Sequence, residues 1–151
     1  MKFMMLIKAD KNTEAGKMPE EKLLVAMGEY NEELVKAGIL LAAEGLQPSS
    51  KGARIRFAGG KTTVIDGPFS ETKELIAGFW MIQVKSKEEA IEWAKRVPFD
   101  PQGPSATTGG VGEIELRQLF EAADFSPDLY PSEEAQALMR AEGEFRKRTN
   151  T

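Results

Sequence analysis

The segment from Ile76 to Val84, IAGFWMIQV, restricts the fold of this chain more than any other feature. It is short, apolar and rich in aromatic residues, which is typical of a β-strand. Successive side chains of a strand point to opposite faces of its sheet, so Trp80 and Ile82 oppose Phe79 and Met81. Both faces of this strand therefore need to be buried.

A second segment, from Phe3 to Ile7, has the same two-faced character and is also predicted to be a strand. Burying a large apolar side chain is worth about 1.5–3 kcal/mol, so several left in water would cost as much as a domain's whole stability. The second face of the sheet must be covered either by another copy of the chain or by its own C-terminal helix. The apolar stripe of that helix, predicted from Ser132 to about Arg146, is thin, which favours the second copy.

The remaining elements complete a β-α-β-β-α-β order. An amphipathic helix begins near Pro19 and ends at Gly38, and a second helix with a Ser-x-x-Glu start runs from Ser86 to Val97. The other predicted segments are loops at 9–18 and 99–112 and strands at 39–47, 54–57, 62–66 and 113–120, with a Gly59-Gly60 hairpin turn. This order predicts an α+β, ferredoxin-like antiparallel sheet with two helices on one face. Residues 1–120 form this domain, and residues 121–151 form a C-terminal extension with one helix.

Composition narrows the chemistry that the chain can perform. Its 151 residues include no cysteine and no histidine, which excludes thiolate sites and removes the commonest general base and metal ligand. Acid–base chemistry must rely on carboxylates, lysine or tyrosine. The net charge of −4 argues against a nucleic-acid partner. No apolar run is long enough to span a membrane, and the N-terminal apolar run is too short for a signal peptide, so we expect a cytoplasmic protein.

The segment Asp66–Glu74, DGPFSETKE, closely resembles the DGPF branch of the YCII-related family. Further matching blocks are MKFMMLIKAD at the N-terminus, AGIL from Ala37, EGLQP from Glu44, EAIEWA from Glu89 and GEIELR from Gly112. The resemblance covers roughly residues 1–120 and implies a dimeric, barrel-type assembly of ferredoxin-like α+β domains with a cleft near the subunit interface. The biochemical role of the family is largely unknown. Some relatives carry a proposed catalytic His–Asp pair, which this chain lacks because it has no histidine.

The DGPF segment has two interpretations. As a turn, Asp66 accepts backbone N–H groups, Gly67 takes a special conformation and Phe69 fills the core. As a ligand-binding cleft, it gathers Asp66, Glu71, Lys73 and Glu74 around a shared proton, a cation or a cationic ligand. No spaced acidic loop supports a metal site, and no GxGxxG motif supports a nucleotide cofactor, so neither is expected.

Four further residues are candidates. Glu44 is the one charged residue in an otherwise uncharged run, so it needs a partner, and Arg117 is a possible one. Arg117 can instead form a rim ion pair with Glu115. Tyr30 lies on the apolar stripe of the first helix, which favours a satisfied core hydroxyl over a catalytic one. Arg54 and Arg56 share a face of the hairpin and either bind an anion or keep that edge soluble.

These residues support two hypotheses of function. In the first, a homodimer binds a small molecule or partner in a cleft rimmed by Asp66, Glu44, Lys73 and Arg117. In the second, the chain is a small cofactor-free enzyme of isomerase, lyase or hydrolase type, with Asp66 or Glu44 as a buried general base and Tyr30 or Lys73 as acid. A third possibility is that the acidic C-terminal extension engages another protein.

Overall fold

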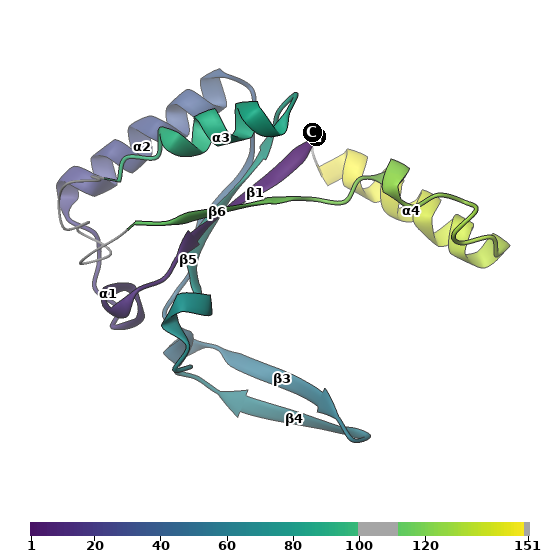
Figure 1. Cartoon of the computed structure of the whole chain (residues 1–151), viewed down its shortest axis with the longest axis horizontal. Coiled ribbons are helices and arrows are strands. Elements are labelled where there is room, and N and C mark those ends of the chain that lie inside the picture. Colours follow the sequence, from purple (N-terminus) through teal and green to yellow (C-terminus); the bar gives the residue numbers. More distant parts are fainter. Residues whose placement is uncertain (100–111, 150–151) are drawn as a thin grey trace.

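The computed structural model describes residues 1–99 and 112–149 of the chain. Its main sheet has the strand order β2-β5-β1-β6, and every neighbouring pair is antiparallel. These strands are β1 (Lys2–Lys8), β2 (Leu40–Gly45), β5 (Ile76–Gln83) and β6 (Ile114–Gln118). Helices α2 (Glu21–Lys36) and α3 (Lys87–Lys95) lie along one face (Figure 1). The predicted α+β fold is confirmed, with the strand order of a ferredoxin-like sheet.

The core lies between these two helices and the sheet. Leu34, Met5 and Ile82 are fully buried there, since the helical spacing of α2 aims its apolar side chains at one face of β1 and β5. Trp80 packs edge-to-face against Tyr30 with ring centroids 5.5 Å apart. The predicted burial of the Trp80 side of the sheet is therefore confirmed.

The hairpin of β3 (Ala53–Ala58) and β4 (Lys61–Asp66) forms a separate two-stranded sheet. It turns at Gly59 and Gly60, whose φ angles of 58° and 71° lie in the left-handed region that glycine adopts without strain. The hairpin extends away from the main sheet (Figure 1), and residues 51–64 are all exposed. The predicted hairpin is thus confirmed, but it is an arm and not part of the main sheet.

Some predicted boundaries were wrong. The segment expected as a loop between Ala9 and Met18 contains the short helix α1 (Lys11–Glu14), capped by the Asp10 carboxylate. The last strand ends at Gln118, so Phe120 lies beyond the sheet and is exposed. The loop predicted at 99–112 falls almost wholly outside the described residues.

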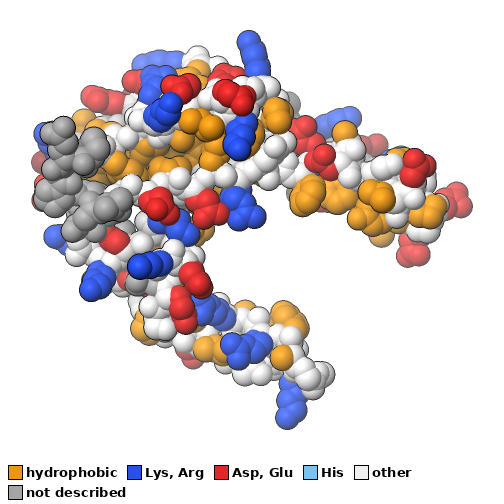
Figure 2. Space-filling view, viewed as in Figure 1, with side chains coloured by type: hydrophobic (Ala, Val, Ile, Leu, Met, Phe, Trp, Pro, Cys, Tyr) orange, Lys and Arg blue, Asp and Glu red, His pale blue; other side chains and the backbone are white. Residues whose placement is uncertain are grey.

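The C-terminal helix α4 (Glu133–Thr149) begins after Ser132, whose Oγ accepts a hydrogen bond from the Ala135 N–H as predicted. The helix extends away from the sheet (Figure 1), so it does not cover the second face. Figure 2 shows a crescent-shaped molecule with a hollow between the hairpin and α4. Within residues 1–99 and 112–149, no helix is long and apolar enough to cross a membrane.

Candidate functional site

The face of the main sheet opposite α2 and α3 carries a central apolar surface. Cross-strand partners share a face, so the register fixes which side chains lie together. One row across the sheet contains Ala42, Met81, Met4 and Arg117, and the next contains Glu44, Phe79, Leu6 and Glu115. We call this surface the open face. Its four large apolar side chains are partly exposed, and within the described part of the chain none of them packs against the core.

The β6 edge of the open face is polar. The Glu115 carboxylate lies 3.1 Å from the Arg117 guanidinium and 3.4 Å from the Lys8 ammonium. Hydrogen bonds from Arg117 and then from Lys8 lower the pKa of Glu115. The rim ion pair predicted for Arg117 is therefore the one observed, and the three groups together carry a net positive charge.

The opposite edge of the open face, formed by β2, ends in an acidic corner. Glu44 is the penultimate residue of β2 and is exposed. Gly45 pairs with Gly78 at the start of β5, so the DGPF segment and the hairpin join the sheet at this same corner. Within one protomer, Glu44 and Arg117 are therefore held apart by the width of the sheet, and the predicted partnership between them is not made.

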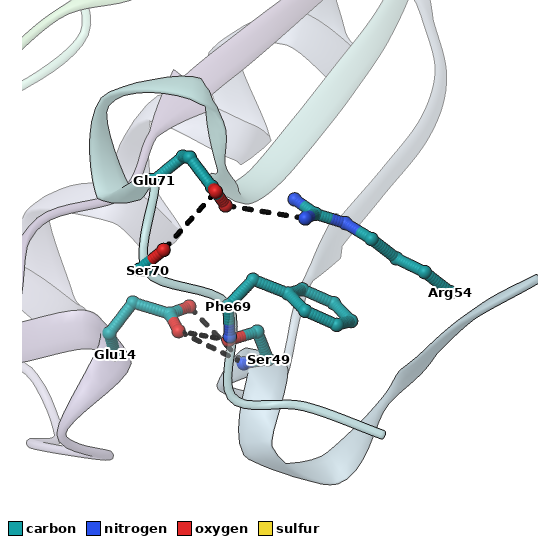
Figure 3. A network of polar contacts seen from close by, with 6 residues as sticks. All are labelled: Glu14, Ser49, Arg54, Phe69, Ser70 and Glu71. Atoms are coloured by element: carbon teal, nitrogen blue, oxygen red, sulfur yellow. Dashed lines mark hydrogen bonds and ion pairs between the residues drawn. The ribbon is translucent and has the colours of Figure 1, made fainter. Parts of the chain in front are cut away.

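The DGPF segment is held in place by a polar network that the sequence did not predict (Figure 3). The Glu14 carboxylate accepts hydrogen bonds from the N–H and the hydroxyl of Ser49. The Ser49 Oγ in turn accepts the Phe69 N–H at 3.0 Å, and the Gly67 N–H donates to the Gly52 carbonyl at 3.0 Å. Residues up to 55 positions apart thus fix one turn, which begins with the cis peptide bond Gly67-Pro68.

The charged residues of the segment lie on its surface. Asp66, Lys73 and Glu74 are exposed. Glu71 accepts hydrogen bonds from its own backbone N–H, from Arg54 at 3.2 Å and from Ser70 at 3.1 Å, and these lower its pKa. In the two described ranges, no three acidic side chains lie close enough to hold a metal ion.

The prediction that Phe69 fills the core was wrong. Its ring lies under the Arg54 guanidinium, whose central carbon is 3.9 Å from the ring centroid, and it is outside the core cluster. Arg54 therefore forms an ion pair with Glu71 and packs on the Phe69 ring. These two contacts anchor the base of the hairpin.

Comparison with known proteins identifies the family of this chain. Residues 1–106 match the YCII-related domain. The chain belongs to the YCII-related family. An uncharacterized protein of Rhizobium meliloti (strain 1021) is 32% identical over 116 residues, which cover 77% of this chain and 86% of that protein. The family predicted from the sequence is therefore confirmed.

In this YCII-related protein, Tyr30 has a structural role. It is buried, and its hydroxyl donates a 2.8 Å hydrogen bond to the Trp93 carbonyl at the end of α3. Burial, helped by the nearby Glu33 and opposed by Arg96, raises the pKa of Tyr30 from 10.0 to about 12. The interpretation of Tyr30 as a satisfied core hydroxyl is supported.

Replacing Tyr30 with phenylalanine is expected to lower the free energy of unfolding at pH 7 by about 0.5–1.5 kcal/mol, because the Trp93 carbonyl loses the Tyr30 hydroxyl as a donor and keeps only the Arg96 N–H. Above pH 10 the unfolded tyrosine ionises while the folded one stays neutral, so the wild type loses stability up to about pH 12. The difference between the two proteins should therefore shrink over this range. Urea denaturation at pH 7, 9 and 11 measures it, with Tyr130→Phe on the surface as the control. A difference that stays constant to pH 11 would contradict the assignment.

Proposed function

We propose that this protein belongs to the DGPF branch of its family and is a homodimer joined through the open faces of two protomers. The further part of the proposal is that a small molecule binds in a cleft near this interface. The observation that carries it is the open face itself, where Met4, Leu6, Phe79 and Met81 form one apolar surface in the middle of the sheet. Contiguous apolar surfaces with a polar border commonly mark interaction sites.

A second copy suits this surface better than the chain's own C-terminus. Helix α4 leaves the sheet and points away from it (Figure 1). When two open faces pack together, each protomer buries its own set of these apolar side chains. A two-fold interface of this kind uses the same self-complementary surface on both protomers. We therefore expect the protein to be dimeric at micromolar concentration.

The predicted ligand-binding residues support a site between protomers. Asp66, Glu71, Lys73, Glu74 and Glu44 all belong to the corner where β2 ends and β5 begins. Arg117 lies on the opposite edge strand, β6, where it pairs with Met4 of β1. One protomer therefore brings only some of the predicted ligand-binding residues together. A cleft lined by all of these residues needs two protomers. The class of ligand that suits such a cleft is a small molecule with an apolar part and a charged group.

The alternative, a cofactor-free enzyme, needs a desolvated carboxylate beside a proton donor. Asp66 and Glu44 are both exposed, and the Tyr30 hydroxyl already donates to a backbone carbonyl. No observation on the described residues favours catalysis over binding, so we propose binding.

A thermal-shift screen of small metabolites tests the binding proposal. A ligand that binds only the folded state raises the unfolding temperature by mass action. We expect a hit to stabilise the wild type and Glu92→Ala, a control carboxylate exposed on α3, while the shift is lost in Asp66→Ala. Equal shifts in all three proteins would remove Asp66 from the site.

A further inference from the structure

The hairpin and the C-terminal segment both extend away from the main sheet and expose apolar side chains (Figure 1). We define the hairpin arm as residues 51–66 and the C-terminal arm as residues 119–149. We infer that the hairpin arm of each protomer docks on the C-terminal arm of a second copy. This inference rests on the proposed dimer and adds to it a specific exchange of arms.

The two arms leave the main sheet at diagonally opposite corners. The hairpin arm joins the corner where Gly45 of β2 pairs with Gly78 of β5. The C-terminal arm starts after Gln118 of β6, which pairs with Phe3 at the other end of β1. Strands β2 and β6 are the two edges of the sheet, so these corners differ both in edge and in end.

Two identical sheets packed face to face are related by a two-fold axis that lies between them. One possible axis runs along the diagonal of the sheet that joins the two corners without arms. A rotation about this axis places the hairpin corner of one copy opposite the C-terminal corner of the other. It sets the hairpin arm of one copy beside the C-terminal arm of the other, and the strands of the two sheets then cross at a large angle, as in orthogonal packing. The same rotation brings Glu44, on the β2 edge, toward Arg117 on the β6 edge of the second copy.

Each arm has exposed apolar side chains that this docking would bury. In the hairpin, Ile55 pairs with Val64 and shares its face with Phe57, and these residues are 52%, 65% and 78% exposed. In the C-terminal arm, Phe120, Leu129 and Leu138 are 72%, 67% and 66% exposed. Figure 2 shows hydrophobic side chains on both arms of the crescent. A two-stranded hairpin is marginally stable alone, so a well-formed one of this kind needs a packing partner.

The charges of the two arms are complementary. The hairpin arm, residues 51–66, contains four Lys and Arg side chains and one Asp, whereas the C-terminal arm, residues 119–149, contains seven Asp and Glu side chains and four Lys and Arg, so their net charges are +3 and −3. Opposite charge on two surfaces steers their encounter and fixes their orientation. The opposite charges favour the C-terminal arm of a second copy as the binding partner of the hairpin arm, because two basic hairpins placed together would repel.

Photo-crosslinking of the full-length protein tests the exchange. A benzoylphenylalanine at position 57 is placed in one copy, which is mixed with a ¹⁵N-labelled wild-type copy, irradiated, digested and analysed by mass spectrometry. We expect crosslinked peptides that join position 57 of the unlabelled chain to residues 119–149 of the labelled chain. The matched control places the same probe at Val35, an exposed apolar residue on α2, which should give no such crosslink.

The outcomes separate this inference from the proposed dimer. A dimeric mass in solution with crosslinks from position 57 only within its own chain, or only to other parts of the second copy, overturns the arm exchange and leaves the dimer in place. A monomeric mass at micromolar concentration overturns the proposed dimer itself, and the exchange with it.

Charge reversal gives an independent measurement. The variants Arg56→Glu/Lys61→Glu and Asp128→Lys/Glu134→Lys should each raise the dimer dissociation constant about tenfold, because like charges then face each other. An equimolar mixture of the two variants should form a heterodimer preferentially, since both of its arm–arm contacts then join opposite charges, one with the native signs and one with both signs reversed. Unchanged dissociation constants for both variants would overturn the inference.

Discussion

Replacing Met81 with glutamate should convert the proposed dimer into a monomer that is still folded. Met81 lies in the central strand β5, on the open face, in the same row as Met4 and Ala42. In a monomer the new carboxylate reaches water, but in the dimer it would be buried without a partner, at a cost of several kcal/mol. Each 1.4 kcal/mol changes a dissociation constant tenfold, so we expect an increase of at least about a hundredfold. Light scattering coupled to size exclusion measures the mass over a dilution series, and circular dichroism checks the fold.

The control for this experiment is Val35→Glu. Val35 is also an exposed apolar residue, but it lies on α2, which covers the other face of the sheet. The same charge introduced there should leave the mass unchanged. The open face would be excluded as the dimer interface if Met81→Glu kept the wild-type dissociation constant, or if both glutamate variants weakened the dimer equally.

The main sheet was predictable because its signals are local. The short apolar runs Ile76–Val84 and Phe3–Ile7 identify both central strands, and the opposite directions of successive side chains give both of their faces. The glycine pair at 59 and 60 identifies the hairpin turn. One consequence was also predictable: a sheet with apolar residues on both faces and helices on only one side must leave a surface open.

The polar anchor of the DGPF segment was not predictable in the same way. Glu14, Ser49 and Phe69 come from three separate segments, and no periodicity or spacing relates them. The sequence presented Asp66, Lys73 and Glu74 as close neighbours, but closeness along the chain does not indicate a shared cleft, and all three are exposed. A carboxylate at the end of α1 that faces a serine was visible only after the fold had joined these segments.

The positions of the hairpin arm and the C-terminal arm were also not predictable from the sequence. The sequence pattern of the two hairpin strands is the same whether they extend the main sheet or form a separate one, because in both cases the strands pair with each other. The C-terminal stripe of apolar residues predicted a helix, and the helix is present. Which surface it packs on depends on the path of residues 119–132, which contains no regular secondary structure except the 3₁₀ turn Ala122–Asp124.

Replacing Gly67 with alanine should cost about 3 kcal/mol of stability or release the DGPF turn from its anchor. A Cβ at this position would lie 1.8 Å from the Ser49 carbonyl oxygen and 2.6 Å from its carbon, and both are backbone atoms that cannot rotate away. Overpacking of this kind costs about 1–3 kcal/mol and occasionally more. For a domain of this size the unfolding temperature should fall by roughly 6–12 °C, measured by thermal denaturation.

The chain provides a matched control in Gly52→Ala. Gly52 faces the same Ser49 carbonyl oxygen, but a Cβ there would lie at 3.6 Å, an ordinary van der Waals distance, and its backbone is extended. This variant should change the stability by less than about 1 kcal/mol. Hydrogen exchange distinguishes the two responses of Gly67→Ala, because a released turn loses protection at the Phe69 N–H while the core strands β1 and β5 keep theirs. If Gly67→Ala were as stable as Gly52→Ala and its Phe69 N–H remained protected, the close contact with Ser49 would not be what fixes this turn, and the segment would be free to adapt around a ligand.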